Sequence, residues 1–257
     1  MDTKVTMMAT RNLPDWNESA QEWAPVVPWE EFVNVKDRTG IFQWNQGQHV
    51  AMIGPTGRGK TTLSLSVLPL RKYIVALATK PRDETLEKFG KQYGFKRYKE
   101  WPEISPDISP RRLLWPDARS LYSAPLQQVH FRRALNQIYS EGNWCVYVDE
   151  LWYIIHHLKL EFEVRTYLQQ ARSNGISFVA TTQRPAFVPL EVYDQSTHLF
   201  FWRDSDEVNL KRISGISWLS ASRIRSLISR LEEHQVLYIN TVSGFMCRTT
   251  APVEGGK

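Results

Sequence analysis

Short apolar runs alternate with amphipathic stretches along the middle of the chain. A central parallel strand is apolar on both faces and a crossover helix is apolar on one, so this alternation predicts an α/β fold with a mostly parallel sheet flanked by helices. The predicted strands are residues 49–53, 73–79, 112–115, 145–149, 176–182 and 197–203. The predicted helices begin near residues 60, 83, 126 and 161.

The fourth predicted strand is preceded by an amphipathic crossover helix at residues 126–141. Its apolar face is expected to carry Leu126, Val129, Leu135 and Ile138. Residues 95–125 contain five prolines and many polar turn residues, which predicts a long connection in place of a helix.

The pattern changes at both ends of the chain. Residues 1–40 are rich in Pro, Asn and Asp and lack periodicity, so they are expected to form an extended arm in front of a single domain at residues 41–257. Beyond residue 203 we expect helices at 204–213 and 217–231. An antiparallel hairpin should follow, with strands at 235–240 and 245–249.

Four of the ten tryptophans lie within the first 50 residues. Their large apolar side chains are expected to hold the arm on the sheet edge, on the core or on a neighbouring subunit. They are Trp16, Trp23, Trp29 and Trp44.

A glycine-rich motif directly follows the first predicted strand. A strand that delivers such a turn onto a helix N-terminus makes an anion cradle from backbone N–H groups and the helix dipole. Lys60 would reach the β- and γ-phosphates of a nucleoside triphosphate, and the Thr61 hydroxyl would bind Mg²⁺. The motif consists of Gly54, Pro55, Thr56, Gly57, Arg58, Gly59, Lys60, Thr61 and Thr62.

An acidic pair ends the fourth predicted strand. Asp149 and Glu150 follow the apolar run Cys145–Val148, at the sheet edge where ligands of open α/β sheets bind. Asp149 is expected to bind Mg²⁺, directly or through water, and Glu150 to polarise the attacking water. ATP and Mg²⁺ are therefore the expected cofactors.

The fifth predicted strand ends on a polar side chain, Gln183. At the tip of the strand beside the acidic one, Gln183 can position the water or sense the γ-phosphate. Arg172 precedes this strand, in a helix that ends at Gly175. By itself it reads as a surface arginine near a helix C-terminus.

Together these motifs resemble the FtsK/HerA group of P-loop ATPases, which includes DNA pumps and viral genome-packaging ATPases. The resemblance covers residues 40–215 and is most specific at Thr182-Gln183-Arg184-Pro185. It implies that Lys60, Glu150 and Gln183 are catalytic. It also implies that Arg172 is a finger inserted into a neighbouring subunit's nucleotide, with Lys80 as a weaker candidate for such help.

The resemblance implies an ATP-hydrolysing motor that translocates double-stranded DNA, in viral genome packaging or mobile-element transfer. The motor would be a homo-oligomeric ring, a pentamer or hexamer, which docks on a portal, capsid or membrane-vertex protein. The alternative is a nucleotide switch in phage assembly or secretion that never threads DNA. A small-molecule kinase is disfavoured, because no substrate lid is recognisable.

Charge, cysteine content and hydropathy indicate the partners and the cellular compartment to expect. The net charge is +5, and residues 71–119 carry twelve basic and seven acidic side chains, so Lys96–Lys99 and the pair Arg111 and Arg112 are candidate DNA contacts. The two cysteines read as buried apolar residues in a reducing compartment. With no signal pattern or membrane span in sight, we expect a cytoplasmic or virion-associated protein.

Overall fold

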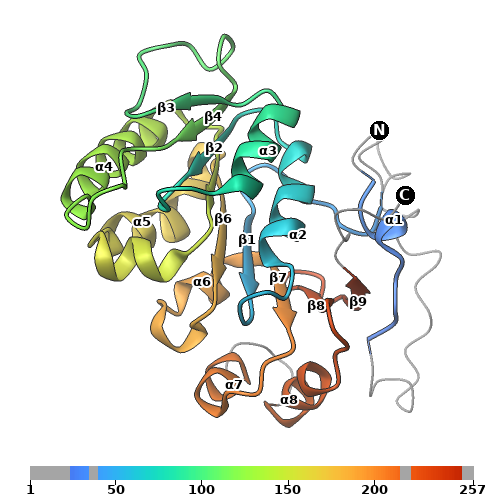
Figure 1. The fold of residues 1–257 in the computed structure, drawn as a ribbon. Coiled ribbons are helices and arrows are strands. Elements are labelled where there is room, and N and C mark those ends of the chain that lie inside the picture. The colour runs from blue at the N-terminus through green and yellow to red at the C-terminus, as the bar shows by residue number, and fades with distance from the viewer. Residues whose placement is uncertain (1–23, 35–39, 215–220, 251–257) are drawn as a thin grey trace, which may run out of the picture.

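The computed structural model of the chain describes residues 24–34, 40–214 and 221–250. Trp16 and Trp23, and most of the expected arm, lie outside these residues. The order of the elements follows the predicted alternation of strand and helix (Figure 1).

Nine strands form one sheet in the order β3-β4-β2-β5-β6-β1-β7-β8-β9. From β3 to β7 all neighbours are parallel, and β8 and β9 add an antiparallel hairpin. This confirms the predicted fold class. The strands are β1 His49–Ile53, β2 Ile74–Leu77, β3 Lys96–Tyr98, β4 Arg111–Leu114, β5 Cys145–Val148, β6 Ser177–Thr182, β7 Ser196–Trp202, β8 Gln235–Asn240 and β9 Met246–Thr250.

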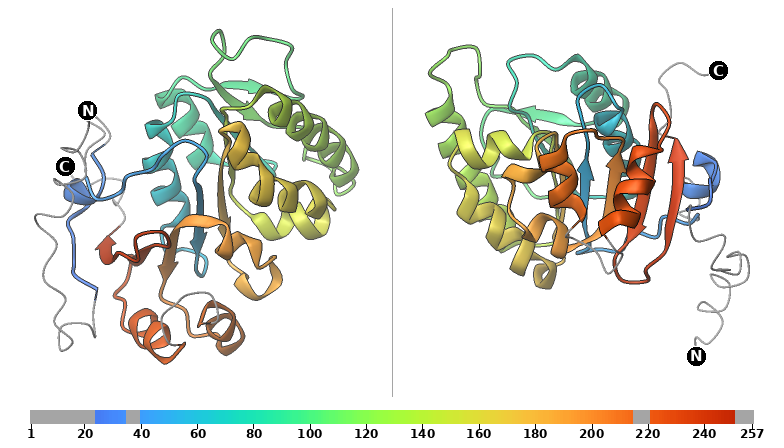
Figure 2. Two further views of the ribbon diagram at one scale, coloured as in Figure 1. Left: turned by 180° about the vertical axis from the view of Figure 1, so that it is seen from behind. Right: turned by 90° about the horizontal axis from the view of Figure 1, so that it is seen from below.

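Helices cover both faces of the sheet. Helices α4 and α5 lie on one face and α2 and α3 on the other, while α7 and α8 lie beyond the carboxyl ends of β1 and β7 (Figures 1 and 2). The α-helices are α1 Trp29–Phe32, α2 Lys60–Val67, α3 Glu84–Gln92, α4 Ala124–Glu141, α5 Glu161–Gln170, α6 Glu191–Asp194, α7 Glu207–Ser214 and α8 Ala221–Ser229. The short turns are η1 Leu68–Leu70, η2 Tyr153–His157, which is π-helical, η3 Ala171–Asn174 and η4 Pro185–Phe187. Among the described residues, every helix is too short or too polar to cross a lipid bilayer.

Six predicted strands are present with ends within two residues of the prediction, and the predicted C-terminal hairpin is present as β8 and β9. One strand was missed. Residues 96–98 form β3 at the outer edge of the sheet, inside the predicted connection. Its charged sequence lacks the apolar run of a central strand, and such charges are typical of an exposed sheet edge.

The predicted apolar face of α4 is partly wrong. Leu126 is 46% exposed and Val129 is 60% exposed, whereas Leu135 and Ile138 are buried as expected. The buried stripe begins instead with the side chain of Gln127, which donates a hydrogen bond to the Thr79 carbonyl at 2.9 Å. Because Gln127 is buried to bond the carbonyl that follows β2, the buried face of α4 differs from the face that the apolar pattern predicted.

Residues 24–34 run beside the last strand of the sheet (Figure 1). Val27 N–H donates to the Arg248 carbonyl at 2.7 Å, and Arg248 N–H donates to the Pro25 carbonyl at 2.7 Å. Phe32 is fully buried and meets the Tyr238 ring at a centroid distance of 4.9 Å. This segment thus covers the outer edge of β9 and joins the same aromatic core as β8.

Arg112, a candidate DNA contact, is instead a core residue. Its side chain is fully buried between the rings of Trp101 and Trp144, at 4.3 and 4.7 Å from their centroids. Its guanidinium donates to the carbonyls of Ser109 at 3.0 Å and Ile104 at 2.5 Å. An arginine enclosed in this way cannot meet a phosphate backbone.

We expect Arg112→Ala to lower the free energy of unfolding by roughly 3 kcal/mol or more, because it leaves a cavity and unpaired carbonyls. Arg111→Ala is the matched control. Arg111 is half-buried and donates one hydrogen bond, to the Tyr93 carbonyl at 2.9 Å, so about 1 kcal/mol should be lost. Urea unfolding of both variants checks this, and equal losses would contradict the structural role.

Candidate active site

The site lies at the carboxyl edge of the sheet, where three predicted motifs meet. Strand β6 pairs in parallel with β5 on one side and with β1 on the other, with Val148 opposite Ala180 and Ile53 opposite Thr182. The residues that follow these strand ends are therefore neighbours. They belong to the glycine-rich loop, the acidic pair and Gln183.

The glycine-rich loop has the geometry of an anion cradle. Gly57 and Gly59 have φ angles of 76° and 96°, which disfavour any side chain. A Cβ on Gly54 would lie 2.7 Å from the Cβ of Trp202, so β7 packs against the start of the loop. Helix α2 starts at Lys60 with no side chain capping its first turn, which leaves its N–H groups free for an anion.

Lys60 is buried at the centre of the cradle. Its ammonium donates to the Pro55 carbonyl of the loop at 2.7 Å. Burial lowers the pKa of Lys60 to about 8, against the opposing pull of the Glu150 and Asp149 carboxylates. A buried ammonium held only by a backbone carbonyl is suited to receive an anionic ligand.

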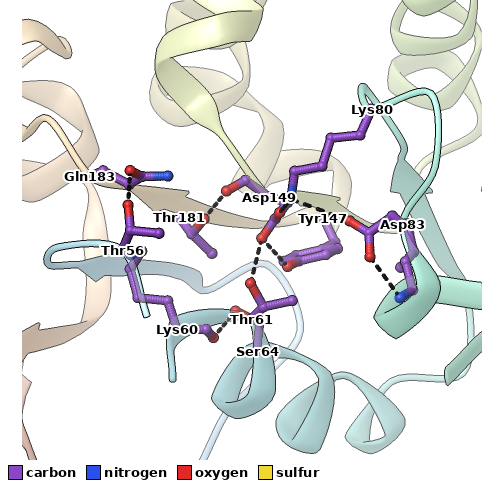
Figure 3. A network of polar contacts seen from close by, with 11 residues as sticks. Thr56, Lys60, Thr61, Ser64, Lys80, Asp83, Tyr147, Asp149, Thr181 and Gln183 are labelled. Carbon is purple, nitrogen blue, oxygen red and sulfur yellow. Dashed lines mark hydrogen bonds and ion pairs between the residues drawn. The ribbon is translucent and has the colours of Figure 1, made fainter. Parts of the chain in front are cut away.

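Asp149 is the hub of the polar network (Figure 3). Its Oδ1 accepts hydrogen bonds from the Thr61 hydroxyl and the Tyr147 phenol, both at 2.9 Å. Its Oδ2 accepts from the Lys80 ammonium at 2.7 Å. Burial favours the neutral acid, but Lys80 and the two hydroxyls outweigh it and lower the pKa of Asp149.

Glu150 differs from its neighbour in environment. Burial raises the pKa of Glu150, and the opposing charge of Lys60 does not offset this. Its Oε1 is buried and has no hydrogen-bond partner among the described residues. A carboxylate with a raised pKa and a free oxygen is suited to accept a proton or orient a water.

Gln183 lies between the loop and the acidic pair. Its Oε1 accepts a hydrogen bond from the Thr56 hydroxyl (Figure 3). Its side chain also lies beside Glu150, where it opposes the rise in the pKa of that carboxyl. Gln183 thus joins the loop to the residue expected to polarise water.

Arg172 lies away from this cluster. It belongs to η3, which Gly175 and Ile176 separate from the first residue of β6, whereas Gln183 directly follows the last residue of β6. A six-residue strand spans about 20 Å, so the arginine cannot reach its own chain's loop. It is exposed, and within the described residues its guanidinium makes no hydrogen bond or ion pair.

Several site residues were missed or undervalued in the sequence. Lys80, only a weak candidate, forms ion pairs with Asp149 and with Asp83 at 3.3 Å in its own chain. Asp204 is buried near Lys60 and helps to keep it charged. Lys80 and Asp204 follow the carboxyl ends of β2 and β7, where ligands of open α/β sheets bind. This position could have identified both residues from the sequence. Tyr147 gave none, because an aromatic residue inside a strand reads as core.

A Mg²⁺-bound triphosphate fits the residues present. The cradle supplies free N–H groups and a buried ammonium for phosphate oxygens. Thr61 and Asp149 supply hard oxygen donors 2.9 Å apart, and the Lys80 ammonium on Asp149 Oδ2 is a stand-in for a cation.

Comparison with known proteins supports the fold. No family model matches this sequence, and no curated protein does either. Among solved structures, the DNA-packaging ATPase B204 from Sulfolobus Turreted Icosahedral Virus is 19% identical, with a TM-score of 0.57, 82% of this chain covered and 100% of that one. The chain has the P-loop ATPase fold.

Two other structures carry the same fold. The genome packaging NTPase B204 from Sulfolobus turreted icosahedral virus 2, in complex with ATP-gammaS, is 15% identical, with a TM-score of 0.57, 82% of this chain covered and 100% of that one. VirB4 of Thermoanaerobacter pseudethanolicus is 9% identical, with a TM-score of 0.60, 87% of this chain covered and 93% of that one. Of the three structures, the first is a DNA-packaging ATPase and the second a genome packaging NTPase.

Burial of the Lys60 charge should make the protein less stable at neutral pH. Lys60 releases its proton near pH 8 when folded but near 10.5 when unfolded, so this penalty is complete below pH 8 and disappears as the pH rises to 10.5. Lys60→Met should therefore raise the free energy of unfolding by about 2 kcal/mol at pH 7, after loss of the hydrogen bond to Pro55.

Urea unfolding at several pH values measures this gain, which should shrink between pH 8 and 10.5. Lys88→Met is the matched control, because it makes the same exchange at an exposed position. A destabilised Lys60→Met protein at pH 7 would show that the site tolerates the charge without penalty.

Proposed function

We propose that the chain is an ATP-hydrolysing motor that translocates double-stranded DNA, in viral genome packaging or mobile-element DNA transfer. The observation that carries this is the convergence of Lys60, Thr61, Asp149, Glu150 and Gln183 on one sheet edge. The names of the structural neighbours, a DNA-packaging ATPase and an NTPase in complex with ATP-gammaS, support the choice of cargo and nucleotide.

Each residue has a role that its surroundings favour. The loop amides and Lys60 would hold the β- and γ-phosphates. Glu150, with its raised pKa and unpartnered Oε1, would accept a hydrogen bond from the attacking water and draw off its proton. Gln183, which hydrogen bonds with Thr56 and lies beside Glu150, would orient that water. Mg²⁺ held by Thr61 and Asp149 would neutralise phosphate charge as the bond breaks.

The position of Arg172 supports an oligomer. It is exposed and about 20 Å from its own chain's loop, so it can act as a finger only in a neighbouring subunit's site. We infer a homo-oligomeric ring of five or six subunits. A portal, capsid or membrane-vertex protein would dock the ring.

DNA binding would use the basic residues that remain exposed. Lys96, Arg97 and Lys99 face solvent at and beside the edge strand β3, although Arg97 also stacks on Trp115 at 4.1 Å from the ring centroid. Arg112 is excluded by its burial.

Linear duplex DNA should stimulate ATP turnover by the parent protein, and the stimulation should fade steeply between about 50 and 200 mM salt as counterions compete for the phosphates. Coupled ATPase assays measure this. Turnover indifferent to DNA would favour the nucleotide switch of phage assembly or secretion.

Glu150→Gln should lower turnover by about 100-fold or more at normal ATP affinity, whereas Lys60→Ala should weaken ATP binding itself. Coupled ATPase assays measure the turnover, and calorimetry measures the affinity for ATP.

Arg172→Ala should bind ATP normally but lose turnover by about 1000-fold, because the transition-state charge loses its partner. Mixing this variant with Glu150→Gln subunits should restore part of the activity, since each intact Glu150 can then meet an intact Arg172. Arg119→Ala removes an exposed arginine that forms an ion pair with Asp117, and serves as the control. Normal turnover by Arg172→Ala alone would refute the finger.

A further inference from the structure

Tyr147 is a buried tyrosine whose hydroxyl points into the site. It lies on β5 and is 1% exposed, and its phenol donates to Asp149 Oδ1 at 2.9 Å (Figure 3). The side chain of Ser64 on α2 lies beside this phenol and donates a hydrogen bond to the Lys60 carbonyl at 2.8 Å. A phenylalanine would fill the same space in the core, so packing alone does not explain the hydroxyl.

The two oxygens of Asp149 are used differently. Oδ1 is held from two sides, by Thr61 on α2 and by Tyr147 on its own strand. Oδ2 faces the Lys80 ammonium, which is half-exposed and can move away. The buried oxygen is thus fixed by neutral donors, and the outer oxygen is the one that meets a cation.

We propose that Tyr147 is a positioning residue for the cation site, because it sets the orientation of the Asp149 carboxylate so that Oδ2 is presented to the metal. This rests on the proposed function, in which Thr61 and Asp149 hold Mg²⁺ beside the nucleotide. Residues that orient a metal ligand by a hydrogen bond commonly change metal affinity by about tenfold or more when they are removed.

This role predicts a separation of two affinities. Without the phenol, Oδ1 keeps only the Thr61 donor, so the carboxylate is free to turn toward Lys80. Metal binding weakens as a result. The grip on the triphosphate itself, through Lys60 and the loop amides, is untouched.

The test compares Tyr147→Phe with Tyr238→Phe by calorimetry with ATPγS, in excess EDTA and in Mg²⁺. Tyr238 is the matched control, since it is also 1% exposed and its hydroxyl hydrogen bonds with His198, outside the site, at 2.9 Å. For Tyr147→Phe we expect the affinity for ATPγS in EDTA to lie within about twofold of the parent's. The increase in that affinity on adding Mg²⁺ should be about tenfold smaller than in the parent. Tyr238→Phe should keep the parent's gain.

A double-mutant cycle separates positioning from a general structural effect. In an Asp149→Ala background, Tyr147→Phe should no longer change the gain from Mg²⁺, because its only route to the metal is gone. Titration of Mn²⁺ followed by electron paramagnetic resonance gives a second readout that does not depend on turnover. An unchanged Mg²⁺ gain in Tyr147→Phe overturns the positioning role alone, whereas a parent protein without Mg²⁺-dependent ATPγS affinity overturns the proposed function as well.

Discussion

The parallel pairing of β6 between β5 and β1 is the constraint on which the site depends. Because the three strands run in the same direction and in register, the residues after Ile53, Val148 and Thr182 lie side by side at one edge. A shift of one residue would turn every side chain of β6 to the opposite face. All three strands are buried at every position and so hold this register. The core thereby fixes the distances between groups that are far apart in sequence.

Electrostatic balance then distinguishes the groups within the site. Lys60 and Glu150 are both shifted toward their neutral forms by burial, whereas Asp149 is kept charged by Lys80 and two hydroxyls. Two neighbouring carboxylates on one strand end thereby acquire different properties, one suited to bind a cation and one to accept a proton. Among the described residues, one buried Glu150 oxygen has no hydrogen-bond partner, and the Lys60 ammonium is held by a loop carbonyl. A stable core would avoid both features, and they fit a site that a ligand completes.

The sequence could predict the parts of this arrangement that are carried by local patterns. Apolar runs located six strands, and the glycine-rich motif and Asp149-Glu150 located the site, because strand ends in a parallel sheet share one edge. The remainder depends on packing between distant residues. The burial of Gln127 turned α4 so that Leu126 and Val129 face outward, and Trp101 and Trp144 enclose Arg112 from separate segments. Tyr147 looks like any core aromatic until its hydroxyl is seen beside Asp149.

Asp149 also joins more of the fold than its position at a strand end suggests. Its side chain contacts Thr61 of α2 and Lys80 after β2, and its backbone carbonyl accepts a hydrogen bond from Thr181 of β6. Lys80 in turn contacts Asp83, which caps α3 by accepting a hydrogen bond from Leu86 N–H at 2.9 Å. A cation that replaced Lys80 at Oδ2 would break its ion pair with Asp149 and leave Asp83, at the start of α3, as the carboxylate that Lys80 contacts. One lysine thus links the acidic pair to the residue that caps α3.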